Sequence, residues 1–184
     1  MSRSVIEPFA LPWLLDPPED LRSQLKVLRK DAESDAGDLR RLAGYALDLN
    51  QLGQMGKAVA ARRDDLAASG LRPLRLAIAA THTADFLVEA LPATALRHGL
   101  LIDSYQADYG QTAQAVLDPS SALFAFKPDL VALAFDPLAL GLASPRLDEG
   151  GGEEAVQSAL DYVTSLRDAV HANAGVGVVL QTLP

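Results

Sequence analysis

The spacing of apolar residues changes near Leu74, and this change divides the chain. Upstream, apolar residues recur every three or four positions, which is typical of amphipathic helices. Downstream, short apolar runs alternate with helical segments, which is typical of strands joined by helices. We therefore expect an arm and a helical extension over residues 1–70, and an α/β sheet domain over residues 71–184.

The helical part begins with a proline-punctuated arm over residues 1–18. Its apolar side chains predict a strap packed on its own domain, or alternatively a docking peptide; they are Phe9, Leu11, Trp13, Leu14 and Leu15. Helices are predicted at residues 19–30, 39–52 and 57–69, with Asp38 as an N-cap and breaks at Gly53 and Gly56. These helices form either a small cap or a dimerisation bundle.

In the α/β part, strands are predicted at residues 74–79, 100–105, 130–135 and 176–180. Helical segments separate them, and Pro92 predicts a kink or a restart in the first. This alternation indicates a parallel sheet of flavodoxin-like or SGNH-like type, flanked by helices. No helix follows the last predicted strand, so we expect the sheet to be incomplete and the chain to be the front portion of a longer protein.

The segment LRLAIAATHT, Leu74–Thr83, joins a buried strand to a polar tip. A strand order 2-1-3-4 would bring Thr81 and His82 close to Asp136, because ligands bind where neighbouring parallel strands end. A threonine hydroxyl, a histidine and an aspartate suggest a nucleophile, its base and an orienting group. Alternatively, Thr83 caps the next helix and His82 is a surface residue.

A second polar turn, Asp108-Tyr109-Gly110-Gln111, follows the second predicted strand. Asp108 and Gln111 would hold a polar ligand and Tyr109 would cover it; the alternative is an ordinary turn. Together with Thr83 and Asp136, these residues are the candidate substrate-binding set. The spacing of histidines and acids suggests no metal site.

Composition narrows the classes of partner. The 184 residues carry a net charge of -8, which disfavours nucleic acid, and the basic clusters at Lys26–Lys30 and Arg62-Arg63 are interpreted as solvated helix faces. There is no cysteine, no signal-peptide core and no apolar segment of membrane-spanning length. We expect a cytoplasmic protein without a membrane partner.

These residues also resemble a known family. Several segments resemble the N-terminal region of FkbH-like proteins: LPWLLDPPEDLRSQL, GYALDLNQLGQMGKAV and LRLAIAATHTADFLVEALPATALRHGL. The most specific resemblance lies between Tyr109 and Asp129, in YGQ, LDPSSAL and KPD. Such proteins join an SGNH-hydrolase-like module to a phosphatase-like module of the haloacid dehalogenase superfamily. The resemblance implies transfer of a glyceryl unit from a phosphorylated glycerate to an acyl carrier protein in polyketide or related biosynthesis, with magnesium only in the C-terminal module.

The SGNH motifs are degenerate in this chain. The G-D-S block would fall on Ala79–Thr81, and the G-x-N-D block on Ala134–Pro137, without its glycine or asparagine. The D-x-x-H block would lie beyond Pro184. We therefore expect an accessory binding module whose chemistry resides downstream. The alternatives are a diverged hydrolase or acyltransferase that uses Thr81, His82 and Asp136, and a structural dimerisation module.

Overall fold

The computed structural model describes residues 13–30, 35, 37–143 and 151–181. Its contacts divide the chain into two compact units. The helical unit comprises Met1–Arg72 and Glu89–Leu101, and the sheet unit comprises Pro73–Val88 and Ile102–Pro184. The helical unit thus includes a segment, Glu89–Leu101, that the apolar pattern assigned to the α/β part.

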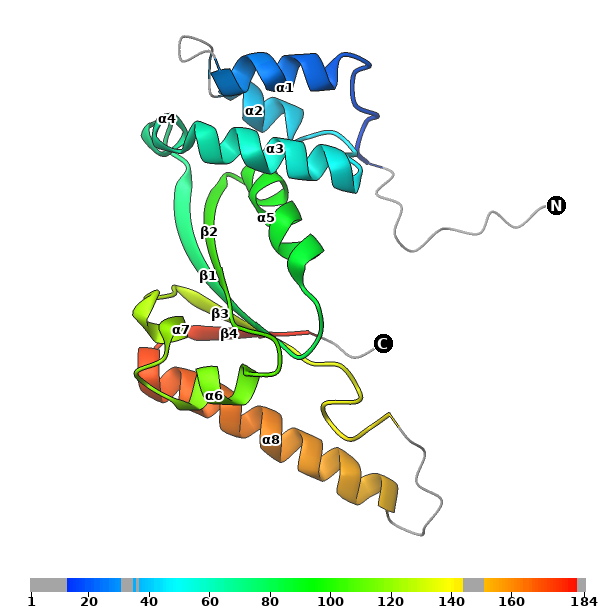
Figure 1. Cartoon of the computed structure of the whole chain (residues 1–184), viewed down its shortest axis with the longest axis vertical. Coiled ribbons are helices and arrows are strands. Elements are labelled where there is room, and N and C mark those ends of the chain that lie inside the picture. Colours follow the sequence, from blue (N-terminus) through cyan, green and yellow to red (C-terminus); the bar gives the residue numbers. More distant parts are fainter. Residues whose placement is uncertain (1–12, 31–34, 36, 144–150, 182–184) are drawn as a thin grey trace, which may run out of the picture. The chain divides into compact units, whose positions relative to one another are not determined.

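The helices of the helical unit are labelled in Figure 1, and their buried apolar residues form a hydrophobic core. Its helices are α1 (Leu21–Lys30), α2 (Gly37–Leu42), α3 (Leu49–Ala61), α4 (Arg63–Ala68) and most of α5 (Asp85–Arg97). In α1, Leu21, Leu25 and Leu28 share one face because they are three or four positions apart, and that face is buried. The predicted helix over residues 19–30 is therefore confirmed as α1.

The predicted helix over residues 39–52 is wrong, because the chain breaks after α2 and starts again at α3. Asp38 is not an N-cap: it lies in the first turn of α2, where its carboxylate accepts a hydrogen bond from Arg41 at 3.2 Å. Asp48 caps α3 instead. Its side chain accepts the Gln51 N–H at 2.8 Å, and the Gln51 side chain accepts the Asp48 N–H at 2.9 Å. This reciprocal capping box satisfies two N–H groups that a helix start leaves unpaired.

The predicted breaks at Gly53 and Gly56 are also wrong, because α3 runs through both. Gly56 lies where α3 approaches α5 closely: a Cβ atom there would lie 3.2 Å from the carbonyl oxygen of Glu89. This glycine allows two helices to pack rather than ending one. Similarly, α5 continues past Pro92 without restarting.

Arg62, between α3 and α4, is a buried residue and not part of a solvated face. Its Nη1 donates to the carbonyl of Leu28 at 2.9 Å, and its Nε pairs with Asp65 at 2.6 Å. A buried guanidinium needs such partners because desolvation is costly. Arg62 therefore ties α1 to the junction of α3 and α4.

The described residues of the sheet unit form a four-stranded sheet (Figure 1). Its strands are β1 (Arg72–Ala80), β2 (Leu100–Gln106), β3 (Leu130–Ala134) and β4 (Gly177–Leu180). Their order is β2-β1-β3-β4, and β3 pairs in parallel with β1 and with β4. The α/β class, the parallel sheet and the predicted strand order are confirmed.

Three helices cover one face of this sheet: α6 (Thr112–Leu117), α7 (Ala122–Ala125) and α8 (Gly151–Ala174). Alternate strand residues meet them, as the period of a strand requires. From β1 and β3, this core takes Ala77, Ala79, Val131 and Leu133, and from the helices Val116, Leu123, Leu166 and Val170. Among the described strands β4 lies at one end of the order, and its Val179 and Leu180 are about half exposed (48% and 46%).

Only residues 13–18 of the arm predicted to form a strap are described, and of its apolar residues there Leu14 is half-buried while the other two are exposed. Trp13 and Leu15 are 72% and 74% exposed, although the Leu15 carbonyl accepts the Ala46 N–H at 2.8 Å. Phe9 and Leu11 lie outside the described residues. Among the described residues, no helix combines the length and the hydropathy needed to cross a membrane.

Candidate functional site

The carboxyl ends of β1 and β3 bring Thr81 and Asp136 together. Ala80 and Ala134, the last residues of these strands, are partners in the parallel register. The Thr81 N–H donates to the carbonyl of Ala134 at 2.9 Å, and the Asp136 N–H donates to Thr81 Oγ1 at 3.0 Å. Two of the predicted site residues, Thr81 and Asp136, therefore meet at the edge of the sheet where α/β proteins bind ligands.

The catalytic hypothesis requires the carboxylate of Asp136 to orient His82, but a different group of Asp136 contacts Thr81. Its backbone N–H, not its carboxylate, faces the Thr81 hydroxyl. The carboxylate instead accepts the Ala139 N–H at 2.7 Å and closes the turn that follows β3. An aspartate that holds its own turn in this way is a common turn device. Asp136 thus positions Thr81 through the backbone and does not orient a histidine.

His82 contacts the end of β4 rather than Asp136. Its Nε2 lies 3.1 Å from Gln181 Oε1, and its Nδ1 lies 3.3 Å from the carbonyl oxygen of Thr83. Both ring nitrogens are therefore engaged by groups other than the Thr81 hydroxyl. The arrangement holds the imidazole across the ends of the strands, but it does not form the nucleophile-base pair that covalent catalysis requires.

Sequence reasoning missed two residues that shape this site. Gln181 follows β4 directly, so its position at the carboxyl edge of the sheet was the available signal. Thr112 begins α6, is 3% exposed, and donates its hydroxyl to the carbonyl of Ala80 at 2.8 Å. That bond fixes the last residue of β1, next to Thr81. The available signal was a threonine at a helix start after a polar turn.

The turn after β2 is exposed in this structure. The Gln111 N–H donates to the carbonyl of Asp108 at 3.0 Å, and the turn begins with the Ala107 N–H on the carbonyl of Ile78 at 2.8 Å. Tyr109 is 76% exposed and covers no group. Asp108, Tyr109 and Gln111 thus flank the β1 end without closing it, and their role in binding stays a prediction.

Chemically, the site offers hydrogen-bonding groups without a charge relay. The Thr81 hydroxyl accepts from Asp136 and keeps its own hydrogen to donate. Thr83 is exposed, and Asp136 and His82 are half-buried, so a ligand can reach them. In the part of the chain that the structure describes, no group of three or more histidines and acids is placed to hold a metal ion. This geometry suits the binding of a small polar group.

Comparison with known proteins shows a likeness of fold. No protein-family model and no curated protein matches the sequence. Among solved structures, the chain is similar to the N-terminal part of the protein BF1531 from Bacteroides fragilis, which contains a phosphatase domain and was crystallised with magnesium. The TM-score is 0.58 at 19% identity, over 75% of this chain and 34% of that chain. The chain therefore spans about a third of that structure and shares the fold of part of it.

Proposed function

We propose that this chain is the N-terminal binding module of a longer protein that loads a glyceryl unit onto an acyl carrier protein. In this proposal the unit comes from a phosphorylated glycerate, and the chemistry takes place in a phosphatase-type domain of the haloacid dehalogenase superfamily. Magnesium belongs to that domain. The proposal includes a cytoplasmic location, which suits a chain without cysteine.

The observation that carries the proposal is the fold shared with the N-terminal part of a protein that contains a phosphatase domain. The chain covers 34% of that structure, so a module of this kind occurs there beside further chain. The segments that resemble FkbH-like proteins support the same assignment. That resemblance is also the reason for proposing a glyceryl unit as the substrate and a carrier protein as the partner.

The hydrogen bonds at the strand ends support binding rather than bond breaking. Asp136 donates to Thr81 across the ends of the neighbouring strands β3 and β1, and His82 contacts Gln181, which follows β4. A glyceryl unit carries hydroxyl and carbonyl groups, which need donors and acceptors at fixed positions. The Thr81 hydroxyl and the Asp136 carboxylate are of that kind, and the residues of the β2 turn lie beside them on the neighbouring strand.

The proposal is tested with the 184-residue chain and a carrier protein loaded with a glyceryl thioester. We expect the chain to bind the loaded carrier protein more tightly than the unloaded form, and the thioester to hydrolyse no faster than in buffer. The measurements are calorimetric titration and mass spectrometry of the carrier protein. Equal binding of loaded and unloaded forms, or no binding of either, would contradict the proposal.

A diverged hydrolase or acyltransferase is the second candidate, because Thr81 and Asp136 do meet at the strand ends. This candidate requires that the chain release glycerate from the thioester. It also requires that Thr81→Ala abolish the release while Thr164→Ala, at an exposed position on α8 outside the candidate site, preserves it. The binding proposal expects no release from any of these three proteins.

A further inference from the structure

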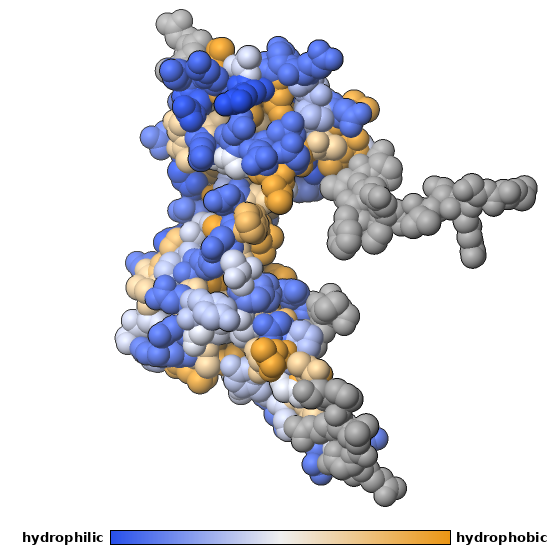
Figure 2. All heavy atoms as spheres, turned by 45° about the vertical axis from the view of Figure 1, so that its right-hand side comes forward, coloured by the Kyte–Doolittle hydropathy of each residue, from blue (hydrophilic) through white to orange (hydrophobic). Residues whose placement is uncertain are grey.

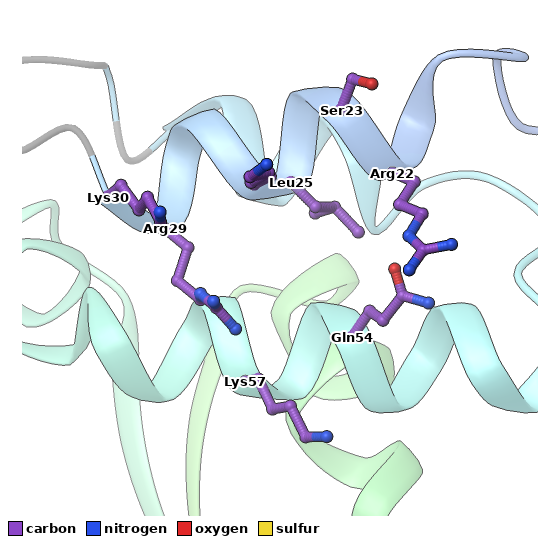
Figure 3. Close-up of a pocket in the computed structure, with 8 residues that line it drawn as sticks. Arg22, Ser23, Leu25, Arg29, Lys30, Gln54 and Lys57 are labelled. Atoms are coloured by element: carbon purple, nitrogen blue, oxygen red, sulfur yellow. The ribbon is translucent and has the colours of Figure 1, made fainter.

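The face of the helical unit formed by α1 and α3 carries a basic groove. Its volume is about 600 Å³, and it is lined by Arg22, Ser23, Leu25, Lys26, Arg29, Lys30, Gln54 and Lys57 (Figure 3). Five of these residues are cations and none is an acid, although the whole chain has a net charge of -8. We call this surface the α1–α3 groove.

Among the described residues, the cations of the groove lie in no ion pair. All five are exposed. Figure 3 shows Arg22 and Arg29 extending from α1 toward α3, with Gln54 rising from α3 beside Arg22. Within the part of the chain that the structure describes, no ion pair of the fold uses their positive charge.

The spacing of these cations destabilises α1 slightly. Lys26 lies four residues from both Arg22 and Lys30, and like charges at that spacing cost roughly 0.2–0.5 kcal/mol per pair. Arg29 and Lys30 are favoured by the negative end of the helix dipole, but Arg22 lies in the first turn, where the dipole disfavours it. Helix stability accounts for the last-turn cations alone, so Arg22, Lys26 and Lys57 need another explanation.

An apolar surface adjoins the charges. Val27 is 56% exposed and lines a neighbouring hollow of about 460 Å³ together with Ser23, Lys26 and Lys30. Val27 also borders a hollow whose lining includes Asp20, Asp38 and Arg41, with Arg41 paired to Asp38. The basic strip is therefore short, about 15 Å from the ten residues of α1, and Asp20 lies at its border.

From these observations we propose that the α1–α3 groove binds an acidic amphipathic helix of a partner protein. Carboxylates of that helix would meet Arg22, Lys26, Arg29 and Lys57, while its apolar side chains would contact Val27. A helix of about three turns matches the length of α1. The short length of the strip and the net charge of -8 disfavour a nucleic acid or a membrane, whose charge would extend beyond the groove over a chain that is negative as a whole.

This inference goes beyond the proposed function, since it holds for any acidic helical partner; only the identification of that partner as the carrier protein rests on the proposed function. It also corrects an expectation about the second basic cluster. Arg62 is buried among its partners and is unavailable for docking, whereas the α1 cluster, interpreted from sequence as a solvated face, lines a groove.

The first experiment uses a labelled synthetic peptide of about four helical turns, with glutamates on one face and leucines on the other. Its binding to the chain is measured by fluorescence anisotropy. The groove variant is Arg22→Gln with Lys26→Gln and Arg29→Gln, which relieves the like-charge repulsion in α1 and so preserves folding. The control replaces three exposed cations elsewhere with glutamine, at Arg72, Lys127 and Arg167.

We expect the groove variant to bind the peptide about tenfold more weakly than the native chain, from three surface ion pairs of about 0.5 kcal/mol each. The control should bind within about twofold of the native chain, and binding should weaken when salt rises from about 0.05 to 0.3 M. Equal losses in the two variants would overturn the inference. Tighter binding of a short RNA duplex or of phosphatidylserine vesicles would also overturn it.

Substituting the carrier protein for the peptide separates this inference from the proposed function. If the carrier protein binds, and the groove variant weakens it while the control does not, both stand. If the peptide behaves as expected and the carrier protein does not bind, the groove inference stands and the proposed function fails. If the carrier protein binds both variants equally, the groove is not its docking surface and the inference is overturned for that partner.

Discussion

At the scale of single residues, the candidate site shows what sequence patterns can place and what they cannot. The alternation of strands and helices was enough to put Thr81 and Asp136 at neighbouring strand ends. It could not show that Asp136 would use its N–H for Thr81, because that depends on the turn that its carboxylate closes with Ala139. His82 and Gln181 are 99 residues apart in the sequence. Their contact depends on how the two side chains are oriented in the folded sheet, and no local sequence pattern encodes that.

Thr112 provides the first prediction at this scale. Thr112→Val keeps the shape of the side chain but leaves the Ala80 carbonyl without its buried donor, so we expect a loss of about 1–3 kcal/mol in the free energy of unfolding. Urea denaturation followed by circular dichroism measures this loss. Thr83→Val, at an exposed position in the adjacent tip, is the control and should change stability by less than about 0.5 kcal/mol.

Asp118 provides a second prediction, on pH dependence. The side-chain hydroxyl and the N–H of Ser120 both donate to its carboxylate, and they lower its pKa from the ordinary value of 3.8. Because the pKa is lower in the folded chain, the bonds stabilise the turn above the unfolded pKa and are lost as the pH falls through the folded one. Ser120→Ala should therefore raise the pKa of Asp118 in a carbon-13 NMR titration. Ser121→Ala should not, since Ser121 donates to Ala115.

At the scale of helices and strands, the spacing of apolar residues predicted where elements lie better than where they begin and end. The capping box of Asp48 and Gln51 was visible as D-x-x-Q, and it would have divided the predicted helix over residues 39–52 correctly. The two glycines of α3 misled the prediction because a glycine that ends a helix and one that admits a neighbour look alike in sequence. Only the approach of Glu89 to Gly56 distinguishes them.

The two glycines of α3 therefore give a matched pair of substitutions. Gly53→Ala should stabilise the chain by about 0.5–1 kcal/mol, because alanine favours a helix and its Cβ would lie 3.8 Å from the nearest atom, Glu89 Oε2. Gly56→Ala gains the same propensity but places its Cβ 3.2 Å from the Glu89 carbonyl. We expect its stability to fall below that of Gly53→Ala in urea denaturation. Equal stabilisation by both would show that α3 and α5 pack less closely than described.

At the scale of the whole chain, the two units defined by residue contacts differ from the two parts that the spacing of apolar residues predicts. The residues of α5 after Val88 belong to the helical unit, although α5 follows the first strand of the sheet. Sequence predicts that a helix follows the strand, but the choice of packing partner depends on the surface that α3 offers. On the face shown in Figure 2, hydrophilic side chains cover much of the helical unit, with apolar side chains between them.

The two cores share no residue, which leads to a prediction about local stability. Leu39→Ala opens a cavity among fully buried residues of the helical unit, at a cost of about 2–5 kcal/mol. In hydrogen exchange followed by mass spectrometry, we expect α1 and α3 to lose protection and β3 and α8 to keep theirs. Leu133→Ala, in the sheet core, should give the reverse pattern. Uniform loss in both variants would show that the units unfold together.

The position of β4 at the end of the sheet has a consequence for the colloidal behaviour of the chain. A net charge of -8 keeps copies apart at low ionic strength, while an edge strand with exposed Val179 and Leu180 is a template for pairing at short range. Added salt shortens the repulsion and leaves the apolar contact intact. Self-association, measured by sedimentation velocity, should therefore increase as salt is added, and it should disappear in Val179→Lys. Over the same rise in salt, the binding of an acidic helix to the α1–α3 groove should decrease.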